Sequence, residues 1–259
     1  MSATTGSGSG AGWATGPARA AGAARTAVVW DALSRLLEGL AEGGPLKIVD
    51  AGGGTGGAAV PLAELGHHVT VVEPSPDSLA ALERRAAEQG VTVRGVQGET
   101  RDLASLFAPG SADLVLVHNV LEYVEDPVAA LRDVVGITRE GGAVSLLVTN
   151  AAAGALHRAL AGHIAEAQHL LGDPDGRWGE GDPMPRRFTS RRLLELVRGA
   201  GLARESVRGV RVFADLVPGH AWEGDAQAGQ HLVELERSAA EHPELIGIAT
   251  QLHAIAHRP

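Results

Sequence analysis

Cysteine is absent from this 259-residue sequence, aromatic residues make up 3% of it, and no apolar run approaches the length of a membrane span. Without cysteine the chain has no disulfide bond, no cysteine nucleophile and no thiolate metal site, which is typical of a reducing compartment. A membrane helix needs about 20 predominantly apolar residues, so no span is expected. The sequence therefore indicates a cytoplasmic protein.

The first residues are rich in Ser, Thr and Gly and have neither the basic nor the apolar region of a secretory signal. Such a segment cannot bury enough apolar surface to fold, so we expect residues 1–16 to be a disordered tail. Apolar residues make up 44% of the chain, which is enough for a sizeable core. We therefore assign residues 17–259 to one globular domain.

Basic residues are in deficit, because 22 Lys and Arg face 31 Asp and Glu and give a formal net charge of −9. Proteins that coat long nucleic acids are usually basic, so the charge argues against a broad contact with phosphates. A small basic patch could still recognise a folded RNA. The densest basic cluster is Arg186, Arg187, Arg191 and Arg192. Such clusters are usually solvated helix starts, and contact with RNA phosphates is the alternative.

Five short apolar segments alternate with segments of helical periodicity. The predicted strands are 46–50, 68–72, 91–96, 113–117 and 143–148. The predicted helices are 25–42, 57–65, one capped by Asp77 that extends to 89, 103–107 and 126–137. Strands that alternate with helices pair in parallel and are covered on both faces, so the sequence predicts an α/β sandwich.

The pattern changes after the fifth strand. Residues 151–171 are alanine-rich and mostly helical in spacing, and residues 172–187 form a loop rich in Gly, Pro and Asp. We interpret 151–189 as a helical and loop insertion that acts as a lid. Two β-like stretches, 202–213 and 246–257, come after a predicted helix at 190–201 and flank another near 230–240. Two successive strands at this point suggest an antiparallel pair that closes the sheet.

Residues 50–57 read DAGGGTGG and follow the first predicted strand, which is how several families of proteins begin a nucleotide site. Gly52, Gly54 and Gly57 satisfy the pattern of dinucleotide-binding folds. Gly52, Gly54 and Gly56, with Asp50 before them, equally satisfy the pattern of S-adenosylmethionine sites. Glu73 lies 21 residues after Gly52, and its carboxylate can hold ribose hydroxyls in either case. The glycines alone therefore leave the cofactor undecided.

Other features favour S-adenosylmethionine. The carboxylate of Asp50 suits a cationic group such as the ammonium of a methionine moiety, whereas dinucleotide sites usually have an apolar residue there. Residues 113–127, DLVLVHNVLEYVEDP, resemble the fourth motif of class I S-adenosylmethionine methyltransferases. Gly141 and Gly142, together with the β-rich C-terminal part, match the reversed last strand of that class. A dinucleotide-dependent oxidoreductase is the alternative.

The resemblance to class I methyltransferases implies a Rossmann-like sandwich with a seven-stranded, mostly parallel sheet, an antiparallel last strand and a helical insertion after the fifth strand. Residues 98–103, GETRDL, resemble the loop that meets the adenine ring in that class. The resemblance implies that Glu99 accepts a hydrogen bond from the adenine amino group, with the neighbouring Thr100 in the same loop. His118 ends a buried strand at the edge where ligands bind, so it is a candidate for contact with the cofactor or the substrate.

Several stretches also resemble a narrower family, the bacterial tRNA 5-carboxymethoxyuridine carboxyl methyltransferases. The resembling pieces are 22–25 with 29–30, 50–54, 118–122, 145–147 with 150–151, His157 with 161–162, 209–213 (GVRVF) with Asp215, and 234–236. This resemblance implies O-methylation of a carboxylate on a wobble uridine in the tRNA anticodon loop. It also implies that Arg25 meets the methionine carboxylate of the cofactor, a pairing that suits the arginine fork. The acidic loop 172–187 and Tyr123, in place of Trp, depart from the family.

Methyl transfer from a sulfonium is an in-line displacement, for which the enzyme mainly positions the nucleophile. A carboxylate acceptor is already ionised at neutral pH and needs no general base, whereas an amine or hydroxyl acceptor more often does. His118 and His157 are the candidate bases, Tyr123 either lines the substrate mouth or packs, and Asn150 either contacts the substrate or caps a helix. These four are the predicted catalytic residues. His157, His163 and His169 lie six residues apart, which places them on different helix faces, so no metal site is expected.

Three other functions stay open on the sequence alone. Methylation of the oxygen or nitrogen of a small metabolite is favoured by the acidic charge. A non-catalytic subunit that binds cofactor or RNA would share the same motifs, as would the oxidoreductase. The predicted cofactor-binding residues are Arg25, Asp50, Gly52, Gly54, Gly56, Glu73, Glu99, Thr100 and His118.

Overall fold

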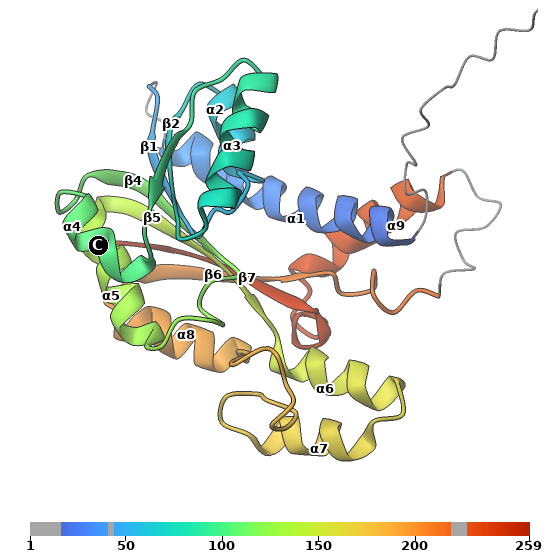
Figure 1. Ribbon diagram of the computed structural model, residues 1–259. Helices are drawn as coiled ribbons and strands as arrows, with labels where there is room; N and C mark the ends of the chain where they lie inside the picture. The colour runs from blue at the N-terminus through green and yellow to red at the C-terminus, as the bar shows by residue number, and fades with distance from the viewer. Residues whose placement is uncertain (1–16, 41–43, 219–226) are drawn as a thin grey trace, which may run out of the picture.

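A computed structural model describes residues 17–40, 44–218 and 227–259 (Figure 1). The tail expected at residues 1–16 lies outside the described residues. The centre of the fold is a seven-stranded sheet of order β3-β2-β1-β4-β5-β7-β6. Its strands are β1 (Lys47–Ala51), β2 (His68–Glu73), β3 (Arg94–Gln97), β4 (Ala112–His118), β5 (Thr138–Thr149), β6 (Ala203–Val210) and β7 (Gln251–His257).

The first five strands pair in parallel, and β7 runs antiparallel to both β5 and β6. This arrangement confirms the mostly parallel sheet and the antiparallel closing pair predicted from the sequence. The strand β7, which follows β6 in the chain, is inserted between β5 and β6. The carboxyl ends of β1, β2 and β4 meet at one edge of the sheet, where ligands bind in open α/β folds.

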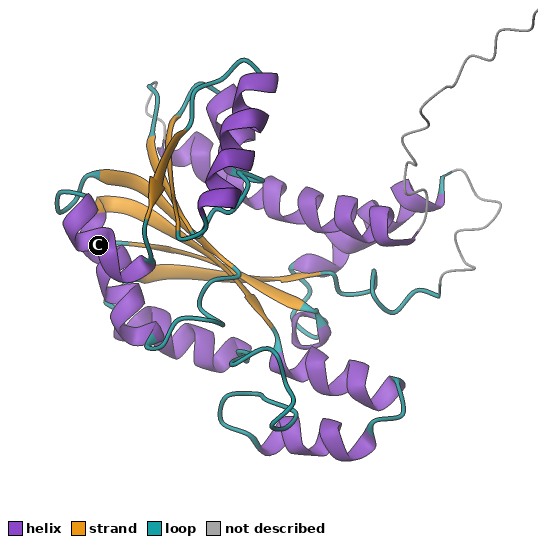
Figure 2. Cartoon of the chain, in the orientation of Figure 1, coloured by secondary structure: helices purple, strands orange, loops and turns teal. Residues whose placement is uncertain are grey.

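Helices cover both faces of the sheet (Figure 2). The α-helices of the described residues are α1 (Pro17–Leu40), α2 (Ala59–Glu64), α3 (Pro76–Glu88), α4 (Leu103–Leu106), α5 (Pro127–Ile137), α6 (Ala151–Leu160), α7 (Ile164–Gly172), α8 (Ser190–Gly199) and α9 (Ala228–Ala240), of which α6 and α7 lie outside these two layers (Figure 1). Alternate residues of β4 point to opposite faces. Leu116 packs in the core with α1, α2 and α3, and Val115 packs in the core with α4, α5 and α8. None of the described helices is long and apolar enough to cross a membrane.

Several element boundaries differ from the predictions. The strand β7 begins at Gln251 and not at residue 246, because Ile246–Ile248 form a short 3₁₀ helix, and β3 begins at Arg94 and not at residue 91. The helix α3 is capped by the Ser75 side chain, which accepts from the Ser78 N–H, and not by Asp77. Proline favours the first helical position, so Pro76 starts the helix two residues earlier than expected. The helix α1 begins at Pro17, because the alanine-rich segment before residue 25 has high helix propensity. The strand β5 begins at Thr138 and not at residue 143. Thr138 pairs with Ala112 across a register shift that the hydrophobic pattern of the sequence does not predict.

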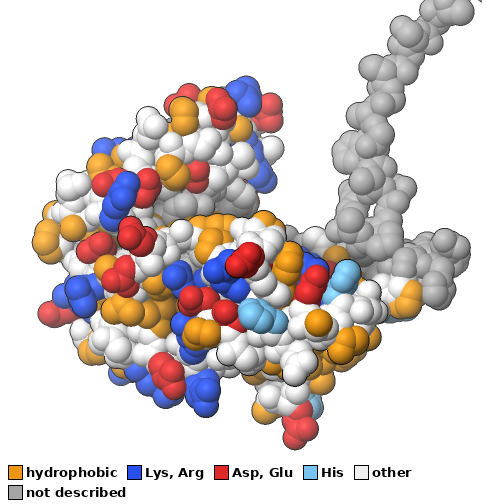
Figure 3. Space-filling model, turned by 60° about the horizontal axis from the view of Figure 1, so that its bottom comes forward, with side chains coloured by type: hydrophobic (Ala, Val, Ile, Leu, Met, Phe, Trp, Pro, Cys, Tyr) orange, Lys and Arg blue, Asp and Glu red, His pale blue; other side chains and the backbone are white. Residues whose placement is uncertain are grey.

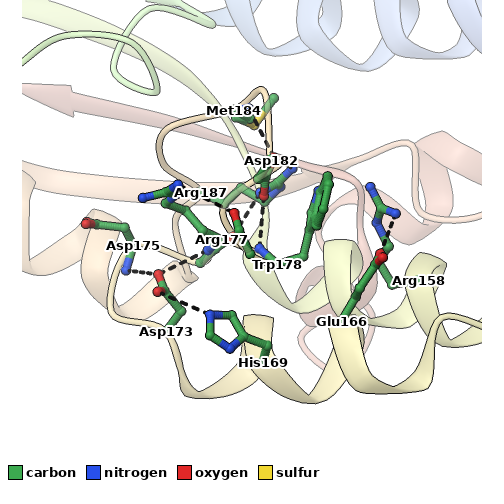
Figure 4. Close-up of polar contacts among 12 residues, drawn as sticks. Arg158, Glu166, His169, Asp173, Asp175, Arg177, Trp178, Asp182, Met184 and Arg187 are labelled. Carbon is green, nitrogen blue, oxygen red and sulfur yellow. Dashed lines mark hydrogen bonds and ion pairs between the residues drawn. The ribbon is translucent and has the colours of Figure 1, made fainter.

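The insertion after β5 contains α6, α7 and the loop 172–187. It lies beyond the carboxyl end of β5 and outside the layers of the sandwich (Figure 1). The loop is held by its own polar contacts, in which Asp182 accepts from Arg187 and from the Trp178 and Met184 N–H groups (Figure 4). The Arg158 guanidinium lies 4.1 Å from the centre of the Trp178 ring, which joins the loop to α6.

Candidate active site

The turn between β1 and α2 is shaped by glycine. Gly52, Gly54 and Gly56 have φ values of 74°, 54° and 80°, which L residues with a side chain rarely adopt. A Cβ atom at Gly52 would come within 2.3 Å of the Val120 side chain. The three positions with positive φ are the glycines of the S-adenosylmethionine pattern, whereas Gly57 of the dinucleotide pattern has no positive φ.

Two adjoining cavities open beside this turn. The smaller, of about 380 Å³, is lined by Arg25, Asp50 and His118, and the larger, of about 710 Å³, is lined by Glu73, Glu99, Thr100 and Tyr123. Gly52 and Asn119 line both. The cavities therefore form one elongated site that runs along the carboxyl ends of β1, β2 and β4.

Arg25 of α1 carries an uncompensated charge into the smaller cavity. Its Nε donates to the Gln251 amide oxygen over 2.9 Å, and its Nη2 donates to the Asn119 amide oxygen over 3.1 Å. Both partners are neutral, and within the described part of the chain no carboxylate forms an ion pair with Arg25. Burial, together with the nearby charge of Arg211, lowers the pKa of Arg25. A bound anion would relieve both effects.

Asp50, at the end of β1, is the opposite charge in the same cavity. It is 3% exposed, and its carboxylate accepts no hydrogen bond from any residue that the structure describes. Burial, followed by the charge of Glu73, raises the pKa of Asp50 to about 7. A cation at this carboxylate and an anion at Arg25 would satisfy both groups, so the smaller cavity matches the two charges of an α-amino acid.

The larger cavity contains the acidic residues predicted to meet a nucleoside. Glu73 ends β2, and its carboxylate accepts from the Gly54 and Ser75 N–H groups, each over 3.1 Å. These bonds fix the carboxylate and leave further lone pairs for ribose hydroxyls. The Glu99 carboxylate is 3.1 Å from Arg101 at an exposed position, beside the buried Thr100. This arrangement fits an adenosine group.

The four predicted catalytic residues do not meet in one place. His118 lines the smaller cavity, and Tyr123, which is 59% exposed, stands at the larger one. Asn150 and His157 line a third cavity of about 340 Å³ under the insertion. The Asn150 amide donates to the Gly247 and Ala249 carbonyls and accepts from the Ala152 N–H. These bonds cap α6, and a role for Asn150 in the reaction stays a prediction.

The arginine cluster of the insertion is paired internally. Arg186 contacts Asp175 and donates to the Leu121 and Val124 carbonyls. Arg187 pairs with Asp182, Arg192 lies 3.5 Å from Asp175, and Arg191 lies 4.0 Å from Glu195. Acidic and basic side chains accordingly lie side by side on the face that Figure 3 shows. Two carboxylates of the loop 172–187, those of Asp175 and Asp182, thus contact three of the four arginines and reduce the positive charge that the sequence suggested.

Sequence reasoning missed several residues that hold the site. Gln251 and Asn119 orient Arg25, and Ser145 contacts His118. Asn119 directly follows β4 and has a φ of 58°. Because it is adjacent to the predicted site residue His118, the sequence could have indicated it as a site residue. Ser145 and Gln251 lie in buried stretches of β5 and β7, and nothing in the local pattern distinguishes them from core residues.

The parallel sheet, the glycine turn, the carboxylate at the end of β2 and the cavity with two opposite charges define an α/β enzyme that binds a nucleoside carrying an amino acid. The chain matches the model of the "Methyltransferase domain" family over residues 49–146. It is 32% identical to the tRNA 5-carboxymethoxyuridine methyltransferase of Escherichia coli over 243 residues, which is 92% of this chain and 89% of that protein. The chain belongs to the class I S-adenosylmethionine-dependent methyltransferases, and S-adenosylmethionine is its cofactor.

Other relatives share the class. A ubiquinone biosynthesis O-methyltransferase of Methylocella silvestris is 32% identical over 183 residues, which is 67% of this chain and 64% of that protein. A possible histamine N-methyltransferase of Thermotoga maritima has a TM-score of 0.53 at 20% identity and covers 92% of each chain. The geranyl diphosphate C-methyltransferase of Streptomyces coelicolor has a TM-score of 0.55 at 16% identity and covers 89% of this chain and 78% of its own. These two structures show the fold.

We expect S-adenosylmethionine binding to strengthen with pH because of Asp50. Below its pKa of about 7 the carboxyl is protonated and neutral, and above it the carboxylate attracts the cofactor ammonium. The affinity should rise by up to about tenfold per pH unit between roughly pH 5.5 and 7, and then level off. Calorimetry across this range measures it. Asp50→Asn should bind weakly and independently of pH, and an equally steep profile in that variant would refute the assignment.

We expect Glu73→Gln to weaken S-adenosylmethionine binding by about tenfold. The amide keeps one oxygen but loses the charge, and a hydrogen bond to a charged group contributes about 1.5–3 kcal/mol. Calorimetric titration with the cofactor provides the measurement. Glu64→Gln, at an exposed position on α2, is the control and should leave the affinity unchanged. If both variants bind alike, Glu73 does not hold the ribose.

Proposed function

We propose that this methyltransferase O-methylates the carboxylate of a 5-carboxymethoxyuridine at the wobble position of tRNA. The observation that carries the proposal is the likeness to the Escherichia coli enzyme, which extends over 92% of this chain. This likeness therefore covers the C-terminal part of the chain, where we place the methyl acceptor, as well as the N-terminal part that lines the cofactor cavities. The proposed cofactor ligands are Arg25 for the methionine carboxylate, Asp50 for the ammonium, Glu73 for the ribose, and Glu99 and Thr100 for the adenine.

The charges beside the cofactor cavity support an anionic acceptor. Arg211, which follows β6 with a φ of 59°, lies near enough to Arg25 to lower its pKa. Two guanidinium groups at one site are mutually unfavourable until anions reach them. Asp215 pairs with Arg211 through Nε and Nη2 and orients it, so Arg25 keeps the one uncompensated charge, which the cofactor carboxylate would balance. Arg211 Nη1, which has no hydrogen-bond partner among the described residues, is left to donate to an acceptor carboxylate.

The third cavity offers a place for the acceptor base. Thr250 lines it and also donates to Asp215 over 2.6 Å, which connects the cavity to Arg211. Its wall includes Trp178, an aromatic surface of the kind on which unpaired RNA bases stack. We therefore propose that residues 151–189 form a lid over the acceptor, with His157 beside the bound nucleotide; a contact of the acceptor with Tyr123, which stands at the larger cavity, stays a prediction.

The chemistry asks little of the protein beyond positioning. When bound, S-adenosylmethionine supplies a methyl group on a sulfonium that an ionised carboxylate can attack directly. Burial, together with the charge of Arg25, lowers the pKa of His118 to about 3, so His118 is neutral at physiological pH. Because a carboxylate needs no deprotonation, the chain's own groups need only hold the acceptor in line with the methyl group.

Methylation of a small metabolite is the second candidate. The net charge of −9 and the internally paired arginines of the insertion favour it. A small acceptor avoids the electrostatic repulsion between a polyanionic RNA and an acidic protein surface. The relatives named for ubiquinone biosynthesis belong to this type.

Comparison of tRNA nucleosides by mass spectrometry, from wild-type cells and cells that lack the gene, tests the proposal. We expect one wobble uridine derivative to lose a methyl group in the mutant, and the purified enzyme with S-adenosylmethionine to restore it. The restored group should be a base-labile ester. Arg211→Gln should raise KM for this tRNA far more than the Kd for the cofactor. Identical nucleosides in both strains, with methylation of a small metabolite instead, would support the second candidate.

A further inference from the structure

Three side chains from neighbouring strands form a hydrogen-bonded relay behind the smaller cavity. His118 ends β4, Ser145 lies on β5 and His253 lies on β7. The His118 Nε2 atom is 2.9 Å from Ser145 Oγ, and the same oxygen is 2.8 Å from His253 Nε2. Ser145 and His253 are both 0% exposed. The two imidazole rings meet edge to face, with their centres 5.7 Å apart and their planes at 87°.

Each of the two imidazole rings is neutral and therefore has one proton on its two nitrogens. Burial, followed by the charge of Arg25, lowers the pKa of His118 to about 3. Burial likewise lowers the pKa of His253 well below its usual range, with a smaller contribution from His118. A neutral imidazole has one N–H donor and one acceptor nitrogen, and a serine hydroxyl has one proton. Three protons therefore have to be distributed over five nitrogen and oxygen atoms.

The hydrogen-bond partners restrict that distribution. Ser145 can donate to only one of the two rings, so at least one ring donates from Nε2 to Ser145 Oγ. If both rings donated, the Ser145 hydroxyl proton would have no acceptor among the described residues. If Ser145 donated to His253, the proton of His253 would lie on Nδ1, which is buried and has no partner in the described structure. Unpartnered buried N–H groups are rarer in proteins than unpartnered acceptors.

We propose that His253 and Ser145 fix the tautomer of His118. His253 donates from Nε2 to Ser145, Ser145 donates to Nε2 of His118, and His118 carries its proton on Nδ1. Among the described residues, the only fully buried atom of these three side chains left without a partner in this arrangement is the acceptor Nδ1 of His253. Ser145 and His253 are then positioning residues, and they act on the ligand through His118.

The consequence is that His118 presents an N–H donor to the smaller cavity. No described residue forms a hydrogen bond with its Nδ1 atom, and His118 lines that cavity with Arg25. A donor beside Arg25 adds a second hydrogen bond for an anionic group of the ligand. A ring whose accessible nitrogen already carries the proton cannot act as a general base there. This inference depends on the cofactor class and is independent of which molecule accepts the methyl group.

Nitrogen NMR of the intact enzyme tests the tautomer directly. The protein is labelled with ¹⁵N-histidine, and spectra are recorded with and without S-adenosylhomocysteine. His118→Asn and His253→Asn serve to assign the two rings. We expect His118 to be protonated on Nδ1 and bare on Nε2, and His253 to show the opposite pattern. Protonation of His118 on Nε2, or on both nitrogens, would overturn the proposal.

Three variants then test whether Ser145 links the two rings. Ser145→Ala removes the hydroxyl that selects between the two ring nitrogens, so the His118 nitrogen shifts should show a mixture of both tautomers and the Kd for S-adenosylhomocysteine should rise several-fold. Ser145→Thr keeps a hydroxyl and should retain both the tautomer and the affinity. His253→Gln, whose amide can still donate to Ser145, should also retain the tautomer. If Ser145→Ala leaves the His118 nitrogen shifts unchanged, then Ser145 does not set the tautomer, whatever happens to the stability.

Discussion

Arg25→Ala is expected to weaken S-adenosylmethionine binding by about a hundredfold or more. Truncating one partner of a buried, hydrogen-bonded charge pair costs about 2–5 kcal/mol, and each 1.4 kcal/mol is a factor of about ten in Kd. The effect should be large because Arg25 is held in place before the ligand arrives, by Gln251 and Asn119. Calorimetry with the cofactor, at a pH where Asp50 is ionised, measures the loss.

Two further variants make this test specific. Arg35→Ala removes an arginine from the same helix, where the side chain is 61% exposed and pairs with Glu241, and it should leave cofactor affinity within about twofold because exposed ion pairs contribute little. Arg25→Lys keeps the charge but loses the fork and should fall between the two. Wild-type affinity in Arg25→Ala would show that the methionine carboxylate binds elsewhere.

Glu236→Ala is expected to lower the free energy of unfolding by about 3–5 kcal/mol. Glu236 of α9 is 0% exposed. Its carboxylate accepts from the backbone N–H groups of Val212, Phe213 and Ala214, over 2.8, 2.7 and 2.7 Å. Each donor left unsatisfied in the interior costs about 1–3 kcal/mol, and partial hydration of the opened space reduces the sum. Urea denaturation gives the measurement.

The same variant should also affect the site, because the three N–H groups belong to the segment that directly follows Arg211. Glu234→Ala, two residues earlier on the same helix and exposed, is the matched control and should change stability by less than about 0.5 kcal/mol. Glu236→Gln keeps one acceptor oxygen and should lose less than the alanine variant. Equal stability of Glu234→Ala and Glu236→Ala would contradict the role assigned to the buried carboxylate.

The fold was largely predictable from the sequence because β1, β2, β4 and β5 contain apolar runs that are bounded by turns. The start of β5 was not, because Thr138 joins the strand through a register shift opposite Ala112. Periodicity also could not choose between Ser75 and Asp77 as the cap of α3. That choice depended on the preference of Pro76 for the first helical turn.

The site divided in the same way. Asp50 and Glu73 could be identified because they stand at the ends of strands beside a glycine turn. Gln251 and His253 could not be identified, because β7 is buried on both faces. The role of its polar residues depends on their hydrogen-bond partners on α1 and β5, which the sequence does not reveal. The pairing of the insertion's arginines with its acidic loop was equally hidden, since it depends on how residues 172–187 fold back on themselves.

The position of β7 has a consequence for how the protein is made. The ribosome releases β5 and β6 before β7, yet β7 lies between them in the sheet. Until β7 emerges, β5 exposes an unpaired edge, the kind of surface that recruits other extended chains. Arg25 also lacks its hydrogen bond to Gln251 until that residue, 226 positions later in the chain, has been synthesised. A ribosome-bound chain stalled before β7 would therefore contain the complete glycine turn, lack one of the two side chains that hold Arg25 in place, and leave that edge open to other extended chains.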